Sequence, residues 1–260
     1  MWVINADGTG AEQVASDSES FRALQWTRDG RYAYYRKKCG RASMKDCCLE
    51  RRGIGNRDET EVVCKYEEGH LDRDLSISSS GRTLYSIRGL RANPAMKIVV
   101  TDTRTFEPED LEGNFDHLSY LAISPDGKQL VYVGQQEGSC SDRLFLRDLE
   151  TVEERVLFPP TTLYGYGKPC WSASGEHILL PMQHHSDRRK SKLVAFDVDR
   201  PENPRTLFEG HCWSATWSSD GAHVFLDSYD ESGYCILATS AEGGKAVQRL
   251  TGGSQPLWGE

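Results

Sequence analysis

ISPDGKQLVYV, residues 123–133, is the stretch that decides the fold. An apolar residue and a serine precede an Asp-Gly turn, and an alternating apolar strand returns from it. Because Asp bonds the local backbone and Gly accepts a positive φ, the pattern predicts a tight β-hairpin. The same form, with Asp-Gly or Ser-Gly at the turn, occurs four more times, as LQWTRDGRYAYY (24–35), LSISSSGRTLYS (75–86), PCWSASGEHILL (169–180) and ATWSSDGAHVFL (215–226).

The turn glycines of these hairpins set a regular period. They are separated by 51, 46, 48 and 46 residues and stand at Gly30, Gly81, Gly127, Gly175 and Gly221. A second pair of strands lies between the hairpins, its first member reading KIVVTD (97–102), RLFLRD (143–148), KLVAFD (192–197) and YCILAT (234–239). Four short strands in each period, with almost no helical pattern, are typical of a propeller blade.

We therefore predict an all-β fold: a six-bladed β-propeller of four-stranded antiparallel blades, forming a single domain over residues 1–260. Five complete blades occupy approximately 16–65, 66–112, 113–159, 160–209 and 210–252. The sixth blade is predicted to be incomplete and built from both termini, 253–260 plus 1–15. MWVIN and AEQV would be its third and fourth strands and QPLW its first, which would close the ring without exposed sheet edges.

The W-S-x-D-G hairpin and the VINADGTG stretch resemble the WD40-like repeat of TolB-like β-propellers. A weaker resemblance, through MWVINADGTG and the hairpins that follow, links the chain to oligogalacturonate lyase propellers. Both imply a propeller over nearly the whole chain, but this repeat serves binding scaffolds, peptidase-associated propellers and polysaccharide lyases alike. The lyases carry metal-binding histidines near the hairpin aromatic residue. None of the matching positions here is His, so the resemblance supports the fold more than the lyase chemistry.

Composition excludes some classes of function. The 260 residues carry a formal net charge of -8, which opposes binding of nucleic acid through its phosphates. No apolar run reaches the roughly 20 residues of a membrane span, and no signal-peptide pattern is visible. The eight cysteines include no C-x-x-C pair. We expect buried thiols, with a local disulfide among Cys39, Cys47, Cys48 and Cys64 as the alternative. A cytoplasmic location is favoured over a periplasmic or secreted one, which would apply if the chain is a fragment or has lost a signal peptide.

Candidate site residues fall at one end of the predicted blades. The residues seven positions before each turn glycine should line the channel, and a mixed polar ring there suits a small anionic or saccharide ligand; the alternative is an ordinary solvated channel. His70, His117 and His211 precede their turn glycines by 11, 10 and 10 residues, and PMQHH ends a second strand at the same end. Imidazoles there suit a divalent metal or acid-base chemistry, although His is also common in polar loops. The candidate ligand-binding residues are Asp74, Tyr120, Lys168, Ser214, His117 and His211, the fifth ring position being Ala23; the candidate metal ligands are His70, His184 and His185.

These observations favour a non-catalytic binding or protein-interaction scaffold with its ligand or partner site at the channel mouth. Its partner would be a protein or a small anionic or saccharide molecule, and it would need no catalytic residue and no cofactor. The alternative is a carbohydrate-active enzyme, an oligogalacturonate lyase-like polysaccharide lyase acting on acidic oligosaccharides, with or without a divalent metal. A propeller that gates a serine peptidase would need a G-x-S-x-G nucleophile elbow, which these residues lack.

Overall fold

The structure is a computed structural model. It describes residues 2–3, 9, 12–13, 21–27, 29–37, 48–53, 60–65, 70–90, 96–111, 116–135, 141–159, 161–231, 233–244 and 247–252. Two compact units are present, the first running to His117 and the second starting at Leu118. Within the described ranges no helix is long and apolar enough to cross a membrane.

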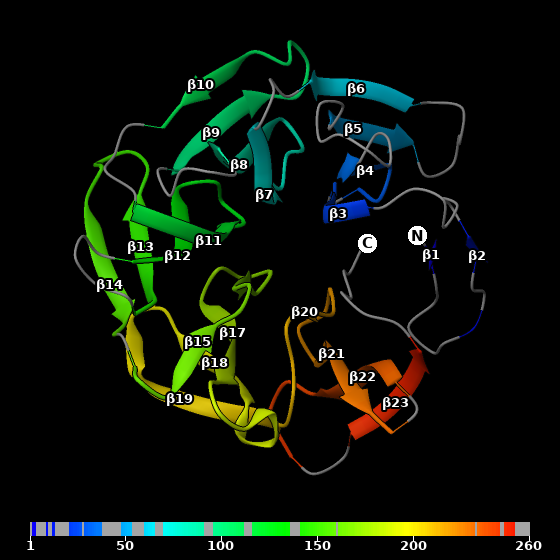
Figure 1. Ribbon diagram of the computed structural model, residues 1–260, viewed down its shortest axis with the longest axis vertical. Coiled ribbons are helices and arrows are strands. Elements are labelled where there is room, and N and C mark those ends of the chain that lie inside the picture. Colours follow the sequence, from blue (N-terminus) through cyan, green and yellow to red (C-terminus); the bar gives the residue numbers. More distant parts are fainter. Residues whose placement is uncertain are drawn as a thin grey trace. The chain divides into compact units, whose positions relative to one another are not determined.

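The first unit contains two four-stranded antiparallel blades (Figure 1). Blade 1 consists of β3 (Phe21–Trp26), β4 (Tyr32–Lys37), β5 (Cys48–Gly53) and β6 (Thr60–Lys65). Blade 2 consists of β7 (His70–Ile77), β8 (Thr83–Leu90), β9 (Met96–Asp102) and β10 (Pro108–Asp110). Each strand pairs with the next along the chain, so both blades are simple meanders.

The second unit contains three blades of the same topology. Blade 3 consists of β11 (Asp116–Ile123), β12 (Gln129–Gln135), β13 (Arg143–Asp148) and β14 (Glu154–Phe158). Blade 4 consists of β15 (Tyr164–Tyr166), β16 (Cys170–Trp171), β17 (His177–His184), β18 (Lys192–Asp197) and β19 (Arg200–Glu209). Blade 5 consists of β20 (Ala215–Trp217), β21 (His223–Asp230), β22 (Gly233–Ser240) and β23 (Val247–Gly252). In blade 4, β15 and β16 are two pieces of one first strand, because both pair with β17.

All five hairpin turns share two hydrogen bonds: the hydroxyl of the first turn residue accepts a backbone N–H from the returning strand, and its carbonyl accepts the N–H of the turn glycine. In blade 3 the Ser124 hydroxyl accepts the Gln129 N–H at 2.9 Å and donates to Asp126 Oδ1 at 2.6 Å, while Gly127 N donates to the Ser124 carbonyl. The five turn glycines have φ between +66° and +77°, a conformation that costs glycine little. Blades 1 and 5 repeat the hydroxyl–aspartate bond, and blades 2 and 4 replace it with a Ser–Ser pair.

The blades bury their apolar faces against their neighbours within each unit. In the first unit Tyr34 and Leu49 of blade 1 pack with Leu75 and Leu84 of blade 2. In the second unit one cluster joins blades 3 and 4, and another joins blades 4 and 5. The hairpin tryptophans tie these layers together: Trp171 Nε1 donates to the Ala122 carbonyl of the preceding blade at 3.0 Å. Trp217 Nε1 donates in the same way to the Cys170 carbonyl at 3.4 Å.

The prediction of six blades is wrong, since the structure has five four-stranded blades. The predicted third and fourth strands of a sixth blade do pair, as β1 (Trp2–Val3) and β2 (Glu12–Gln13), but they form a sheet of two strands only. In every complete blade the second strand joins the first to the third, and among the described residues no such strand accompanies β1 and β2. The predicted first strand, QPLW, lies outside the described residues.

A short 3₁₀ helix interrupts blade 4. It is η2 (Arg188–Lys190), between β17 and β18, and the Asp187 side chain caps it by accepting the Arg189 N–H at 3.0 Å. This cap fixes the basic run DRRKSK at the end of the blade opposite the hairpin turn.

Candidate binding site

Among the predicted site residues up to His117, His70 and Asp74 stand in β7 of blade 2, Ala23 stands in β3 of blade 1, and His117 stands in β11, the first strand of blade 3. Asp74 stands in β7 and is buried, whereas the side chains of His70 and Ala23 lie outside the described residues. His117 is exposed and has a φ of +43°.

Those of the second unit lie in blades 3, 4 and 5. Tyr120 of β11 packs against the core shared by blades 3 and 4. Lys168 follows β15 and Ser214 precedes β20. His184 is the last residue of β17, and His185 follows it. The structure thus places Lys168, Ser214, His184, His185 and His211 in two adjacent blades. Whether any of them binds a ligand remains a prediction.

Ser191 joins three segments of this part of the molecule. Its buried hydroxyl accepts the His184 N–H at 3.0 Å, and its carbonyl accepts the Gly210 N–H at 2.7 Å. Its own N–H donates to the Arg188 carbonyl at 3.2 Å. The end of β17, the helix η2 and the end of β19 therefore meet at one residue. Gln183 and His211, which adjoin the first and last of these segments, are brought to the same end of the blade.

His211 is the unusual member of this group. The residue is only 9% exposed, yet neither nitrogen of its imidazole ring has a hydrogen-bond partner among the described residues. Burial and the nearby positive charge of Arg188 lower the pKa of the imidazole, while the carboxylate of Asp227 opposes that change. The ring is therefore held neutral at neutral pH, with one N–H to donate and one nitrogen to accept.

Asp227 of β21 fixes the loop that carries His211. One carboxylate oxygen, Oδ1, accepts the N–H groups of Trp213 at 2.7 Å and Ser214 at 2.9 Å, and the Asp227 N–H donates to the Ser214 carbonyl. A glycine allows this loop to approach blade 4. A Cβ at Gly167 would lie 2.9 Å from both the Trp213 carbonyl oxygen and Pro181 Cβ. Ser214, a predicted site residue, helps to hold the loop through its backbone N–H and carbonyl, which both bond Asp227.

Aromatic and basic side chains surround these polar groups. Trp213 is 42% exposed, and its ring meets the His211 ring edge-to-face with centroids 5.4 Å apart. Tyr164 of β15 meets His184 in the same way at 5.2 Å, and Lys192 Nζ lies 5.3 Å from the centre of the Tyr164 ring. We call Gln183, His184, Arg188, His211 and Trp213 the histidine edge.

The structure also bears on the histidines as metal ligands. Nδ1 of His184 accepts the N–H groups of Ser186 and Asp187, so that nitrogen is engaged within its own loop. In the part of the chain that the structure describes, no three His, Cys, Asp or Glu side chains form a group that could hold a metal ion. A metal site that includes His70 remains a prediction, because that side chain is not described.

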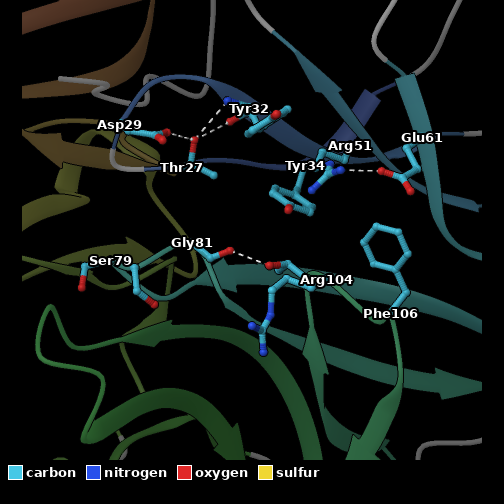
Figure 2. Close-up of a pocket in the computed structure, with 12 residues that line it drawn as sticks. Thr27, Asp29, Tyr32, Tyr34, Arg51, Glu61, Ser79, Gly81, Arg104 and Phe106 are labelled. Atoms are coloured by element: carbon cyan, nitrogen blue, oxygen red, sulfur yellow. Dashed lines mark hydrogen bonds and ion pairs between the residues drawn. The ribbon is translucent and has the colours of Figure 1, made fainter.

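A separate pocket of about 430 Å³ lies between blades 1 and 2 (Figure 2). Its wall holds the guanidinium of Arg51, which pairs with Glu61 and lies 4.7 Å from the centre of the Tyr32 ring and 5.6 Å from that of Phe106. Burial alone would lower the pKa of Arg51, but its contacts with Tyr34 and Glu61 raise it overall. Since this cation is already paired, the pocket carries weaker evidence of a ligand than the histidine edge.

Sequence reasoning found part of the histidine edge. The count back from the turn glycine located His211, and the PMQHH stretch located His184. Trp213 was missed, although HCWS places an aromatic residue two positions after the histidine. Arg188 was visible only as one charge in a basic run. Only the pairing at Ser191 shows that it lies beside His211.

No protein-family model and no curated protein sequence matches the chain. Several solved structures, in contrast, match its fold. TolB from Acinetobacter baumannii superimposes with a TM-score of 0.76 at 17% identity, over 93% of this chain and 57% of that one. The fold is a β-propeller. A putative TolB from Agrobacterium tumefaciens gives a TM-score of 0.72 at 18% identity, over 95% of this chain and 86% of that one.

An oligogalacturonate lyase in complex with manganese gives a TM-score of 0.68 at 14% identity, over 96% of this chain and 70% of that one. Both resemblances read from the hairpins therefore correspond to structural neighbours of this propeller. At such identities they establish the fold alone. The chain spans little more than half the length of the A. baumannii TolB chain.

Proposed function

We propose that the propeller is a non-catalytic binding scaffold whose ligand site is the histidine edge of blades 4 and 5. The observation that carries this proposal is the buried imidazole of His211, whose two nitrogens are bonded by no residue that the structure describes. Leaving a buried polar group without a partner costs about 1–3 kcal/mol. We infer that such a group is kept because it has a use, and a bound ligand would supply the missing partners.

The surroundings of His211 suit binding for a second reason. Trp213 is held by the Asp227 carboxylate through its backbone N–H, so its exposed ring is presented in a fixed place. Gln183 adds a buried amide nitrogen that also lacks a partner among the described residues. Donors and an aromatic surface fixed in advance lower the ordering cost of binding.

The test is a ligand-observed NMR screen of the full chain against ring-bearing neutral, anionic and cationic compounds. The matched variants are His211→Ala and His223→Ala, the latter an exposed histidine at the turn end of blade 5. Compounds that bind the wild type and the His223→Ala variant but not the His211→Ala variant would support the proposal. It fails if no compound binds, or if every compound binds all three proteins equally.

A second measurement tests the non-catalytic part. Acidic oligosaccharides are incubated with the chain, with and without manganese, and the ultraviolet absorbance of a newly formed C=C bond is followed. We expect no increase above that of a protein-free control. Turnover that depends on the protein would contradict the proposal in favour of the lyase alternative.

A further inference from the structure

The unpaired groups of the histidine edge have a common chemical character. Gln183 Nε2 and the guanidinium of Arg188 can only donate hydrogen bonds, and a neutral His211 donates through one nitrogen. Arg188 is exposed on η2 and forms no ion pair with another described residue. Two carboxylates adjoin these donors: Asp227 accepts two backbone N–H groups through one oxygen, and Asp187 accepts the Arg189 N–H. This end of blade 4 therefore offers more donors than acceptors.

The positions of these donors follow from the sheet. Arg188 and Gly210 are both bonded to Ser191, and His184, next to Gln183, is bonded to the Ser191 hydroxyl. The donors of three segments are thus within one residue of a common buried point. The positive charge of Arg188 also lies close enough to the His211 ring to lower the pKa of the imidazole.

Beside these donors, the histidine edge presents an aromatic surface. The exposed Trp213 ring borders His211, and a ring-shaped ligand lying on it would have its polar substituents directed at the donors. Aromatic side chains with a polar partner at the rim suit planar or sugar rings.

Resting on the proposed function of this edge, we propose that its ligand is a small ring-bearing oxyanion. Arg188 and His211 bind the phosphate or carboxylate group, Gln183 binds a further oxygen, and Trp213 contacts the ring. Oxyanions match a donor-rich site because each oxygen accepts several charge-assisted hydrogen bonds.

The charged groups around His211 predict how pH acts on this binding. They include Arg188 on η2 and Asp227 on β21, which act on the pKa of His211, and Glu209, which stands two residues before it at the end of β19. A bound oxyanion favours the protonated imidazole, so binding takes up a proton and the affinity rises as pH falls below neutrality. The same ligand should bind the His211→Gln variant with less dependence on pH.

The experiment is isothermal titration calorimetry on the full chain with a matched series of ligands. Glucose 6-phosphate, glucuronate and glucose share a ring and differ at one carbon, and inorganic phosphate has no ring. We expect at least one of the two anionic sugars to bind ten-fold or more tightly than glucose and than inorganic phosphate. The phosphate and carboxylate arms tell which oxyanion is preferred.

Two variants on η2 give the control. Arg188→Gln should weaken binding of the anionic sugar by ten-fold or more, and Arg189→Gln should leave it unchanged. Both side chains are exposed, so neither substitution disturbs the core. Trp213→Ala should weaken the binding of glucose 6-phosphate and leave the binding of inorganic phosphate unchanged.

The proposal is overturned if glucose binds as tightly as its anionic counterparts, or if the Arg189→Gln variant loses as much affinity as the Arg188→Gln variant. Failure here is distinct from failure of the scaffold proposal. Neutral or cationic rings that bind through His211 while no oxyanion does would overturn only the oxyanion assignment. A complete lack of His211-dependent binding would overturn both.

Discussion

The two ends of the blades in the second unit differ in how completely their polar groups are hydrogen-bonded. At the turn ends of blades 3, 4 and 5, the hydroxyl of the first hairpin serine (Ser124, Ser172 or Ser218) has a partner each time. The glycine, this serine and the following strand are bonded in the same way in all three. At the other end of blades 4 and 5, His211 and Gln183 are buried without partners among the described residues. The comparison separates the part of the repeat that stabilises the blade from the part that is available for binding.

The largest expected effect comes from closing the space between the loop and blade 4. In Gly167→Ala the new methyl group would meet the Trp213 carbonyl and Pro181 at 2.9 Å, and relief requires backbone movement. We expect a loss of about 1–3 kcal/mol in the free energy of unfolding, measured with urea. The matched control is Gly165→Ala, whose methyl group meets only ordinary contacts at 3.4 Å and beyond. Equal losses in the two variants would refute the close-approach argument.

The next effect comes from the residue at which the three segments of the edge meet. Ser191→Ala removes the acceptor of the partly buried His184 N–H, so we expect a loss of about 1–2 kcal/mol in the free energy of unfolding. Ser186→Ala, an exposed serine five residues earlier, should change stability by less than about 0.5 kcal/mol. Hydrogen exchange of the His184 amide should rise in the first variant and not in the second. An unchanged exchange rate would show that Ser191 does not hold the edge.

The smallest effect concerns the turn ends and depends on pH. The Ser124 hydroxyl and the Lys128 N–H lower the pKa of Asp126. Because the folded pKa is below the unfolded value of about 3.9, this aspartate stabilises the fold above that pH, and the contribution is lost as pH falls through the folded pKa.

Asp126→Asn should therefore reduce the drop in Tm between pH 7 and pH 2 relative to the wild type. Asp199→Asn, an exposed aspartate in the β18–β19 turn, serves as the control and should leave the drop unchanged. An identical drop in the Asp126→Asn variant would contradict the role given to the hydroxyl–aspartate bond.

The turn ends could be predicted from the sequence because their information is local. Ser, Asp and Gly within four residues determine the bonds of each hairpin, so a repeated motif implies a repeated structure. The error in blade number arose where this information was missing. The terminal strands had the right composition and pair with each other, but no hairpin marked a further blade around them.

The histidine edge could be predicted only in part because its geometry depends on strand register. The distance from a turn glycine located His211 at the correct end of blade 5. Nothing in the sequence indicates that Ser191 bonds both the β17 end and Gly210, or that no described residue bonds the His211 ring. Such information exists only after three strands have paired.

The hairpin tryptophans have a further consequence for how such a chain can change. Trp171 and Trp217 donate to main-chain carbonyls of the preceding blade, and Arg155 and Arg205 donate to those of the following one, at Val198 and Ala241. A main-chain acceptor is present whatever side chain stands at that position. A blade joined to its neighbours in this way can be duplicated, or its surface residues replaced, without a matching substitution in the next repeat. The repeats can therefore diverge independently, and one pair of blades can acquire a binding edge that the others lack.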